Sequence, residues 1–545
     1  MNERPLPTPT SPTGADAPQF GRVTTHTIGR REAIGRAIGL GAAAACAPVL
    51  LACQTTTRPR ASHASGRWRQ DALLRPPTPP REFRAVWVAS VANIDWPATP
   101  TADAASLREQ AGRIVARCKA IGLNTIILQV RPSCDAIYES RLEPWSEFLT
   151  GRAGRGPTPG YDPLEHWITL AHNAGMELHA WFNPFRARHH RATGPDDARH
   201  VVNTRPGLVR TYSNLKWLDP GEPESRQHSL DVITDVIRRY DIDGVHLDDY
   251  FYPYPVAGRP FPDDTPFARF GAGLSRGDWR RRNINEFVQR LGREIKAIKP
   301  GLPFGISPFG IWRPGHPAGV VGFDAYEELA ADARLWLREG WLDYVAPQLY
   351  WKTDAPQQPY EHLLRWWRAQ NTQGRHVWPG LYASRVADAE QRWPKEEILR
   401  QIEIARSVER VAPGVALYSA ATLMSDAGGL ATALQRSPFA EAALPPRYAW
   451  LPGAPAPAAP SVTVQDGGAL SFFNWQAYGE ARGIRGWAVW TRAESGSWTL
   501  RVKGASERSL EVRSRGDGAI DAVAVAAIGP GSVVGEAWSM RRHDR

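Results

Sequence analysis

Cysteine is scarce in this sequence, with 4 residues in 545, and their positions exclude two common uses of the residue. Cys46 and Cys53 lie near the N-terminus, while Cys118 and Cys134 stand alone further along. The sequence has neither the pattern of a disulfide framework nor a metal-ligand spacing, and its histidines are not paired at metal spacing. We therefore expect a fold that does not depend on disulfides, with no metal and no cofactor.

Runs of basic residues are also missing, although the formal net charge is +10 and the pI about 9.5. Lys and Arg are scattered along the chain, whereas nucleic-acid-binding proteins gather them in a stripe or patch. This distribution disfavours nucleic acid as a partner and leaves an anionic polymer or surface compatible with the charge. No obligate protein partner is evident.

Long apolar runs are absent except near the N-terminus, at Ala33–Leu51. The basic pair Arg30-Arg31 precedes that run, and "LLAC" closes it at Cys53. This order is typical of a twin-arginine export signal ending in a lipoprotein box. We expect residues 1–53 to be such a signal, with Cys53 lipidated and the protein held at a membrane in the periplasm or cell envelope. Simple cleavage is one alternative. A single membrane anchor is another, although a Gly/Ala-rich segment would span poorly.

Residues 54–82 are rich in Pro and Arg, and we interpret them as a tether. Over residues 83–445, short apolar or β-branched runs alternate with amphipathic stretches. The runs begin near Phe83, Thr125, Glu177, Gly244, Phe304, Asp343, His376 and Val415. Eight strand–helix units predict the α/β class and a (β/α)8 TIM barrel with enlarged loops. An open doubly wound sheet is the alternative, but no Gly-rich phosphate loop follows the first strand.

Helix boundaries between these strands are marked by capping residues. Asp162 can cap a helix, Pro163 suits its first turn, and Gly175 can end it. Gly122 similarly follows a stretch with helical apolar spacing. These signals support the alternation of strands and helices.

Polar and aromatic side chains collect where the predicted strands end. In a (β/α)8 barrel those ends lie on one face and build the site. Aromatic rings stack on the apolar faces of sugars, and fixed polar groups bind their hydroxyls, so we predict a sugar-binding site. The predicted substrate-binding residues are Asp95, Trp96, Gln129, Arg131, Asn183, Arg186, Tyr250, Tyr252, Gln348, Tyr350, Trp351 and Tyr382.

The fourth strand carries the densest polar group, in "GVHLDDY". Side chains alternate along a strand, so His246, Asp248 and Tyr250 should face the barrel interior and its open end. A fixed carboxylate there can stabilise the positive charge of a glycosidic transition state, while a second carboxyl protonates the leaving oxygen. We predict Asp248 and Asp249 as the catalytic residues. The plainer interpretation of Asp248 is an ion pair with Arg131, and that of Asp249 is a loop-fixing acid. His246 is best interpreted as a core hydrogen-bonding residue.

The stretches "EFRAVWVASVANIDWP" and "DGVHLDDYFYPYP" resemble the glycosyl-hydrolase-like family 10 proteins of bacteria. "WFNPFRAR", "ISPFGIWRP" and "DYVAPQLYW" fit the same pattern, so the resemblance covers most of residues 82–440. It implies a (β/α)8 glycosidase-like domain that is often exported. It also implies an association with peptidoglycan glycan strands, particularly strands stripped of stem peptides.

Two signature comparisons bear on the mechanism. "DGVHLDDY" is similar to the chitinase signature, whose catalytic Glu would fall at Tyr250, but a phenol with a pKa of about 10 cannot replace that acid. It also resembles the amylase-like signature, which implies Asp248 as nucleophile and a Glu after the fifth strand. Here that strand reads "FGISPFG" and has no acid. The proton donor therefore stays open among Asp249, Asp95 and Asp354.

The last part of the chain has a different pattern. Residues 446–460 form a Pro/Ala linker, and residues 461–545 contain short alternating strands separated by turn residues. This predicts a small β-sandwich of fibronectin type III-like kind. It could serve as a spacer or cover on the barrel, or as a glycan-binding module that uses Trp475, Trp487 or Trp490.

Together these observations favour a glycoside hydrolase that cleaves O-glycosyl bonds in a cell-wall polysaccharide, with peptidoglycan glycan strands as the favoured polymer. The alternative is a non-catalytic glycan-binding lipoprotein on a degenerate barrel, which the missing Glu after the fifth strand supports. A metal-dependent deacetylase or amidase is a third hypothesis, but the sequence offers no clear set of His and Asp ligands.

Overall fold

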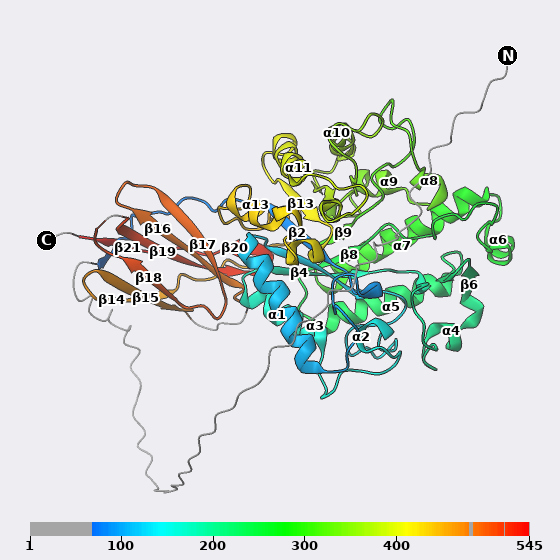
Figure 1. The fold of residues 1–545 in the computed structure, drawn as a ribbon, viewed down its shortest axis with the longest axis horizontal. Helices are drawn as coiled ribbons and strands as arrows, with labels where there is room; N and C mark the ends of the chain where they lie inside the picture. Colours follow the sequence, from blue (N-terminus) through cyan, green and yellow to red (C-terminus); the bar gives the residue numbers. More distant parts are fainter. Residues whose placement is uncertain (1–67, 479–482, 517, 544–545) are drawn as a thin grey trace, which may run out of the picture.

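The computed structural model describes residues 68–478, 483–516 and 518–543. Within these residues, eight parallel strands form the centre of the larger domain, with helices packed around them (Figure 1). Each strand begins at, or one residue from, the position that the sequence predicts. The strands are β2 (Phe83–Val88), β3 (Thr125–Arg131), β4 (Glu177–Phe182), β8 (Gly244–Leu247), β9 (Phe304–Ile306), β10 (Tyr344–Val345), the split strand β11 (His376–Val377) with β12 (Gly380–Leu381), and β13 (Gly414–Leu417).

The parallel pairings join these strands into one curled sheet. Neighbouring strands pair in chain order from β2 to β10, and β13 returns to pair with β2. The seventh strand is split around Trp378-Pro379, where proline has no N–H to donate. Its first half pairs with β10 and its second half with β13. The strands therefore pair in the predicted order within one curled parallel sheet.

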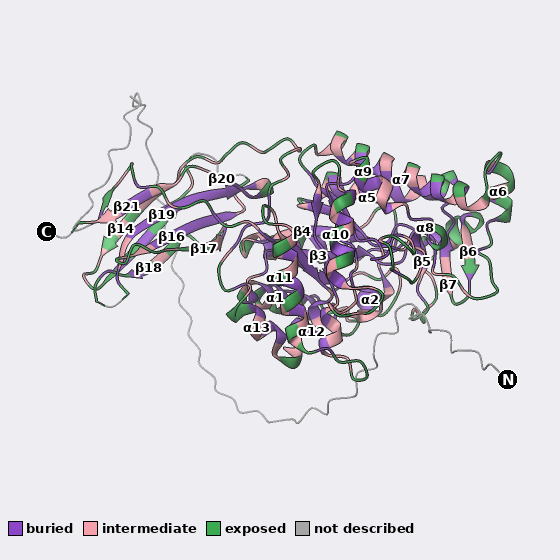
Figure 2. Cartoon of the chain, turned by 90° about the horizontal axis from the view of Figure 1, so that it is seen from above, coloured by how far each residue is buried: buried purple, intermediate pink, exposed green. Residues whose placement is uncertain are grey.

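Helices follow the strands and cover the outside of the sheet, where Figure 2 shows exposed residues outside and buried residues in the strands. β2, β3 and β8 are buried at every position, as parallel strands covered on both faces should be. The helices are α1 (Ala104–Ile121), α2 (Glu147–Thr150), α3 (Pro163–Asn173), α4 (Val201–Thr204), α5 (Pro223–Arg239), α6 (Asp264–Phe270), α7 (Arg276–Ile298), α8 (Ala325–Glu328), α9 (Ala333–Arg338), α10 (Tyr360–Gln370), α11 (Lys395–Val408), α12 (Ala420–Met424) and α13 (Leu430–Arg436).

The predicted capping residues occupy their expected places. The Asp162 carboxylate accepts hydrogen bonds from the backbone N–H groups of Leu164 and Glu165, and Pro163 is the first residue of α3. Gly122 ends α1 with a φ of 93°, a left-handed conformation that glycine adopts without strain. These local signals fix where the two helices start and stop against the barrel.

One enlarged loop contains a small sheet that the sequence pattern does not predict. After β4 the chain forms β5 (Arg186–Arg188), β6 (Val209–Tyr212) and β7 (Leu215–Leu218), paired antiparallel in the order β5-β7-β6. Short 3-10 turns, among them Val91–Asn93 and Ala383–Val386, shape other loops at the same end. The C-terminal ends of the barrel strands, with these loops, are called the mouth below.

The C-terminal domain is a two-sheet β-structure with a shared core. Its described strands are β1 (Trp68–Gln70), β14 (Ser461–Asp466), β15 (Leu470–Gln476), β16 (Gly486–Ala493), β17 (Trp498–Gly504), β18 (Ser509–Arg513), β19 (Ile520–Gly529), β20 (Val533–Val534) and β21 (Trp538–Arg542). One sheet has the order β14-β15-β18 and the other β1-β21-β19-β16-β17. Phe473 and Trp475 from one sheet pack with Trp487 and Val523 from the other.

The start of the described chain belongs to this domain. β1 pairs antiparallel with β21, and Trp68 is buried in the shared core, where its indole N–H donates to Ser471 Oγ at 2.9 Å. Residues 68–70 were predicted as part of the tether at residues 54–82, and for this part the prediction is wrong. Alternation over three residues is too short a signal to mark a strand that pairs far along the chain.

The C-terminal domain packs against the end of the barrel opposite the mouth. Arg485 donates to Asp241 at 2.6 Å and lies 3.5 Å from Asp243, just before β8. Ser532 Oγ donates to Glu177, the first residue of β4, at 2.9 Å. These contacts place the domain as a cover on the strand starts, which was one of its two predicted roles.

The other predicted role used three tryptophans that are not on the surface. Trp475, Trp487 and Trp490 are 3%, 0% and 2% exposed. Trp475 and Trp487 belong to the core between the two sheets, and Trp490 belongs to a second buried cluster that includes Leu444. They cannot stack on a glycan, so the prediction of a glycan-binding module based on them is wrong. Side chains alternate along a strand, so Trp487 and Trp490 lie on opposite faces of β16, and both faces are covered.

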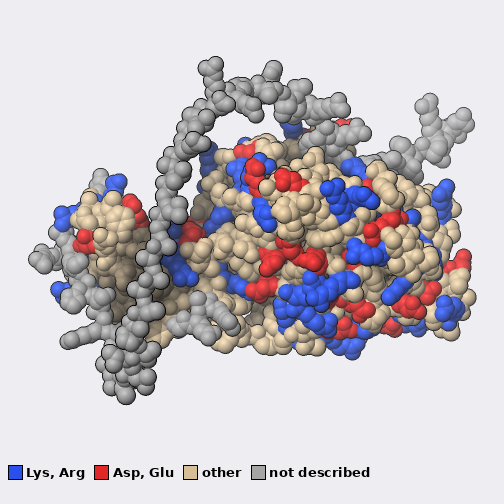
Figure 3. All heavy atoms as spheres, turned by 90° about the horizontal axis from the view of Figure 1, so that it is seen from below, with Lys and Arg blue, Asp and Glu red and all other residues tan. Residues whose placement is uncertain are grey.

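Charged groups of both signs adjoin one another on the molecular face drawn in Figure 3, in keeping with the scattered Lys and Arg of the sequence. Among the described residues, no helix has the length and apolarity needed to cross a membrane.

Candidate active site at the barrel mouth

Two adjacent carboxyls stand at the end of β8, between the ends of β4 and β9. Asp248 and Asp249 follow the last residue of that strand and are 5% and 2% exposed. Buried carboxylates are costly unless hydrogen bonds or cations stabilise them, so their partners decide what each can do. The two side chains have different partners.

Asp248 is held through one oxygen by a fixed amide. Asn183 Nδ2 donates to Asp248 Oδ2. The orientation of this amide is determined because Asn183 Oδ1 accepts from Gln129 Nε2 at 2.5 Å and from Arg186 at 2.7 Å. Gln129 is oriented in turn, since its Oε1 accepts from the backbone N–H groups of Ser90 and Val91. A proton on a neutral Asp248 must therefore sit on Oδ1.

Burial raises the pKa of Asp248 to about 7, and the neighbouring Asp249 charge adds to the rise. Arg186, the Asn183 hydrogen bond and the indole of Trp181 act in the opposite direction. Asp248 Oδ1 is buried and has no hydrogen-bond partner of normal geometry among the described residues, and the indole N–H of Trp181 lies close enough to the carboxyl to lower its pKa. Asp248 thus combines a pKa near neutrality with one oxygen not committed to the protein's own bonds, as a proton donor requires.

Asp249 is bound through both oxygens. Tyr254 donates its phenol proton to Asp249 Oδ2, and Gln348 Nε2 donates to Oδ1 at 3.1 Å. Burial raises the pKa of Asp249, while these two hydrogen bonds oppose the rise. Both donors favour the ionised form, so this carboxyl is the better candidate for the negative charge of the pair.

Arg186 supplies the cation that faces this pair. It lies on β5, is 5% exposed, and donates to Pro132 O at 2.9 Å as well as to Asn183. Its guanidinium lies 5.5 Å from the centre of the Tyr250 ring and lowers the pKa of both Asp248 and Asp249. It therefore favours a negative charge on the pair.

Half-buried aromatic rings extend from the carboxyl pair along the mouth. Tyr254 contacts Tyr250 and Phe323, with ring centres 5.5 and 5.2 Å apart. Tyr350 stacks on Tyr382 at 4.6 Å. We call these rings the aromatic arc, which comprises Tyr250, Tyr254, Phe309, Phe323, Tyr350, Trp351, Tyr382 and Tyr418.

Most residues predicted at the strand ends do meet in this region. Gln129, Asn183 and Arg186 join Asp248 in one hydrogen-bonded network, and Gln348 joins Asp249. Tyr250, Tyr350, Trp351 and Tyr382 belong to the aromatic arc. Gln129 and Asn183 are 0% exposed, so the structure gives them a positioning role in place of the predicted contact with substrate.

Four predicted substrate-binding residues serve the fold instead. Trp96 is 0% exposed and packs edge-on against Trp167 between α1 and α3. Tyr252 is 2% exposed and packs on Phe261. Arg131 is bound to Glu143, which also overturns its suggested ion pair with Asp248.

Asp95 is the fourth. Its Oδ1 accepts from Ser419 Oγ and Ala421 N at 2.7 Å, and its Oδ2 accepts from Ala89 N at 2.8 Å. Burial raises its pKa to about 6 against these bonds. Asp95 therefore joins the loop after β2 to the loop after β13. Both of its oxygens accept hydrogen bonds within the protein, so Asp95 is not placed to act as the proton donor. A position at a strand end predicts the location of a side chain but not its direction.

Several residues of the mouth were not predicted. Phe309 and Tyr418 follow β9 and β13, so the rule that selected the other strand-end residues would have found them. Tyr254 lies in the quoted stretch "DDYFYPYP", but its bond to Asp249 depends on how the loop turns back. His246 was predicted as a core residue, and this is confirmed by its bonds with Trp87 and Tyr344 at 3.1 and 2.9 Å.

For the residues that the structure describes, no group of three or more His, Cys, Asp and Glu side chains is arranged to hold a metal ion.

Comparison with known proteins adds to this geometry. The model of a family described as "Glycosyl hydrolase-like 10" matches residues 82–395. The chain is 38% identical over 394 residues to Glycosyl hydrolase YngK of Bacillus subtilis, an alignment that covers 70% of this chain and 76% of YngK. It is 35% identical over 318 residues to Glycosyl hydrolase DigH of Escherichia coli, covering 52% and 69%.

Among solved structures, the glycoside hydrolase domain of PgaB (BpsB) from Bordetella bronchiseptica is 15% identical, with a TM-score of 0.43, and the match covers 65% of this chain and 98% of that one. A likeness at this level adds nothing to the assignment of chemistry.

Proposed function

Because the chain belongs to the glycosyl hydrolase-like 10 family, we propose that it hydrolyses glycosidic bonds in a cell-wall polysaccharide, with peptidoglycan glycan strands as the favoured polymer. The observation that carries the proposal is the adjacent pair of buried carboxyls in opposite hydrogen-bonding environments. Asp248 has a pKa of about 7, while Asp249 accepts two hydrogen bonds that favour its charge. Environments that separate two carboxyls in this way assign them an acid and a charged role.

In the proposed mechanism Asp248 is the general acid. Its Oδ1 proton passes to the glycosidic oxygen as the bond from that oxygen to the anomeric carbon breaks. Ionised Asp249 stabilises the positive charge that develops on the sugar ring, and water adds to the anomeric carbon. Deprotonated Asp248 accepts the proton that this water releases, which restores the starting state. The sequence had favoured the reverse division, with Asp248 as the fixed charge.

The aromatic arc supports a carbohydrate polymer as the ligand. Half-buried rings that remain partly accessible offer apolar faces on which sugar rings stack, while fixed polar groups bind hydroxyls. Tyr350 and Tyr382 stack on each other, and Tyr254 and Phe309 contact each other in a second set of rings. Two groups of rings suit a chain of several sugars better than a single sugar.

A non-catalytic, glycan-binding protein on a degenerate barrel is the second candidate function. Two observations favour it: Ser307 follows β9 where an amylase-like enzyme has its acid, and Tyr250 stands where a chitinase has its Glu. Such a protein would use the same aromatic arc to bind glycan without cleaving it.

The cellular setting is also part of the proposal. Residues 1–53, including the candidate lipidation site Cys53, lie outside the described residues. We propose export and attachment to a membrane through a lipid on Cys53, in the periplasm or cell envelope, and a fibronectin type III-like fold for the C-terminal sandwich. A Cys53→Ser variant should move from the membrane to the soluble fraction, and retention on membranes would contradict the lipid anchor.

The test of function is incubation of the purified protein with glycan strands, intact and freed of peptides, with products identified by mass. We expect cleavage by the wild type and a loss of about a hundredfold or more in Asp248→Asn and Asp249→Asn. Asp354→Asn, at an exposed acid in the loop after β10, is the matched control and should keep full activity. Binding without cleavage of any polymer would favour the second candidate.

A further inference from the structure

A fully buried ion pair lies beneath the site and takes no part in the mechanism above. The Arg131 and Glu143 side chains are 0% and 1% exposed, with contacts of 2.8 Å to Oε2 and 2.5 Å to Oε1 of the carboxylate. Removing two charges from water costs about as much as their attraction returns, so such a pair gives little net stability. Its effect on geometry is therefore the more informative property.

The arginine fixes the backbone that carries Asn183. Arg131 donates from one guanidinium nitrogen to the carbonyl oxygens of Asn183 and Pro184, at 2.7 and 2.9 Å. In return, the Asn183 N–H donates to the Arg131 carbonyl at 3.0 Å. Ser229 from α5 donates to the same Pro184 carbonyl. The Asn183-Pro184 segment is thus held from both β3 and α5.

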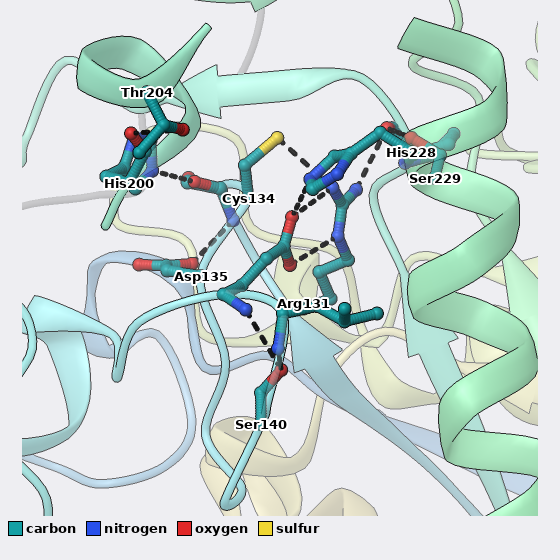
Figure 4. Close-up of polar contacts among 12 residues, drawn as sticks. Arg131, Cys134, Asp135, Ser140, His200, Thr204, His228 and Ser229 are labelled. Carbon is teal, nitrogen blue, oxygen red and sulfur yellow. Dashed lines mark hydrogen bonds and ion pairs between the residues drawn. The ribbon is translucent and has the colours of Figure 1, made fainter. Parts of the chain in front are cut away.

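The glutamate is fixed as firmly as the arginine. His228 of α5 contacts Glu143 Oε1 through Nε2 at 2.8 Å, and the Glu143 N–H donates to Ser140 Oγ at 3.1 Å. Figure 4 shows Arg131 pointing toward His228 and Ser229, with Cys134 beside the guanidinium. The pair therefore connects the loop after β3, the end of β4 and helix α5.

We propose that Glu143 and Arg131, with His228, form a positioning unit that keeps the Asn183 amide on Asp248 Oδ2 and so keeps the Asp248 proton on Oδ1. This inference rests on the proposed function. The direction in which the Asn183 side-chain amide points decides which oxygen of Asp248 it binds, and therefore which oxygen is left for the substrate. The unit acts through Asn183 and touches neither substrate nor the reacting atoms.

Loss of the unit has a predictable effect on proton transfer. The Asn183 hydrogen bond favours the ionised form of Asp248 and holds its pKa down. If Asn183 moves away, that pKa rises, and Asp248 keeps its proton to higher pH. The charged groups that face Asp248 are Asp249 on its own segment and Arg186 on β5, and neither is altered. Glu143 itself faces Arg131, His228, Cys134, Asp135 and Tyr138.

The experiment compares Glu143→Gln with a matched control at the far end of the barrel. Glu82 forms an equally buried pair with Arg84 at 2.6 Å and also binds Arg406 at 2.7 Å. In Glu143→Gln we expect kcat to fall about tenfold, KM to change little, and the alkaline limb of the pH–activity profile to move up by about one pH unit. Glu82→Gln should lower the unfolding midpoint without moving that limb. An unmoved limb in active Glu143→Gln would overturn the proposal.

Two further measurements keep the test decisive. If Glu143→Gln does not fold, His228→Ala serves in its place, because it removes only the contact between His228 and Glu143. The alkaline limb should then move by about half as much, and an unmoved limb in His228→Ala would also overturn the proposal. If the wild type cleaves no glycan, the proposed function fails, and a double-mutant cycle on unfolding midpoints tests the unit separately. Glu143→Gln and Asp248→Asn should then be non-additive at pH 8, and additive effects would overturn the unit.

Discussion

The buried carboxyl of Asp248 makes the stability of the folded protein depend on pH in an unusual direction. Its pKa is raised from 3.8 to about 7, so between these values the folded state binds more protons than the unfolded state. Stability that depends on such a group falls as the pH rises through this window and is constant above it. Most paired acids behave in the opposite way, because their folded-state pKa is lowered.

Asp248→Asn removes this cost while preserving shape and an acceptor for the Asn183 amide. One pKa unit corresponds to about 1.4 kcal/mol, so ionising Asp248 at alkaline pH costs the folded state roughly 4 kcal/mol. Between pH 5 and the pKa near 7 the cost grows by roughly 3 kcal/mol. The variant should therefore be stabilised relative to wild type by roughly 3 kcal/mol more at pH 8 than at pH 5.

The assay is urea unfolding at half-unit steps from pH 5 to pH 8, followed by tryptophan fluorescence, with slopes checked for equality between variants. Any change in hydrogen bonding or packing on Asp248→Asn is independent of pH and cancels in the comparison. A difference between variant and wild type that is flat across this range would refute the raised pKa and, with it, the general-acid role.

Asp196→Asn provides a control of opposite sign. Against its burial, Lys216 and Arg188 hold the pKa of Asp196 down. The pKa of Asp196 lies below pH 5 in both the folded and the unfolded state. The stability that ionised Asp196 contributes is therefore fully present from pH 5 to pH 8 and is lost only at lower pH. The variant should be destabilised by the same amount at pH 5 and pH 8. A slope in this control would mean that the pH dependence of Asp248→Asn arises elsewhere.

Three further predictions concern the pair, the rings and the domain contact. Tyr254→Phe removes a donor to Asp249 and raises its pKa, so the acidic limb of the activity profile should move up by about one pH unit; an unchanged limb would separate Asp249 from catalysis. Tyr382→Ala should raise KM for long glycans about three- to tenfold at nearly constant kcat in initial-rate measurements, and a loss confined to kcat would argue against stacking. Burial raises the pKa of Asp243, but His172 and Arg485 outweigh it and hold that pKa below its usual value. Arg485→Gln should therefore lower the thermal unfolding midpoint by the same amount from pH 5 to pH 8, and by less below about pH 4, where Asp243 becomes protonated. A thermal midpoint of Arg485→Gln equal to that of the wild type would contradict this prediction.

The strands could be predicted because each is a short buried run bounded by turn or charged residues. Wherever burial is complete, as in β2 and β8, the apolar pattern is unambiguous. Over residues 325–340 the amphipathic pattern predicts one helix, whereas the chain forms two short helices, Ala325–Glu328 and Ala333–Arg338. The meander β5–β7 was missed because its residues show no clear alternation and its pairing is set by the tertiary fold.

The candidate site was predicted in place but only partly in role. Strand ends of a parallel barrel must share a face, which is why Asn183, Asp248 and Gln348 could be grouped from sequence alone. The role of Arg131 could not be predicted, because its partner Glu143 lies in a loop whose path the sequence does not encode locally. Similarly, Trp96 sits beside Asp95 at a strand end yet points between helices.

The pairing of β1 with β21 means that both ends of the described chain meet in one sheet, at the pole of the molecule remote from Asp248. Attachment of the protein through residues ahead of Trp68 would therefore join it at the pole opposite the carboxyl pair. Immobilisation at this pole should leave the mouth accessible. Removal of β21 would take away the pairing partner of β1 and part of the packing around Trp68.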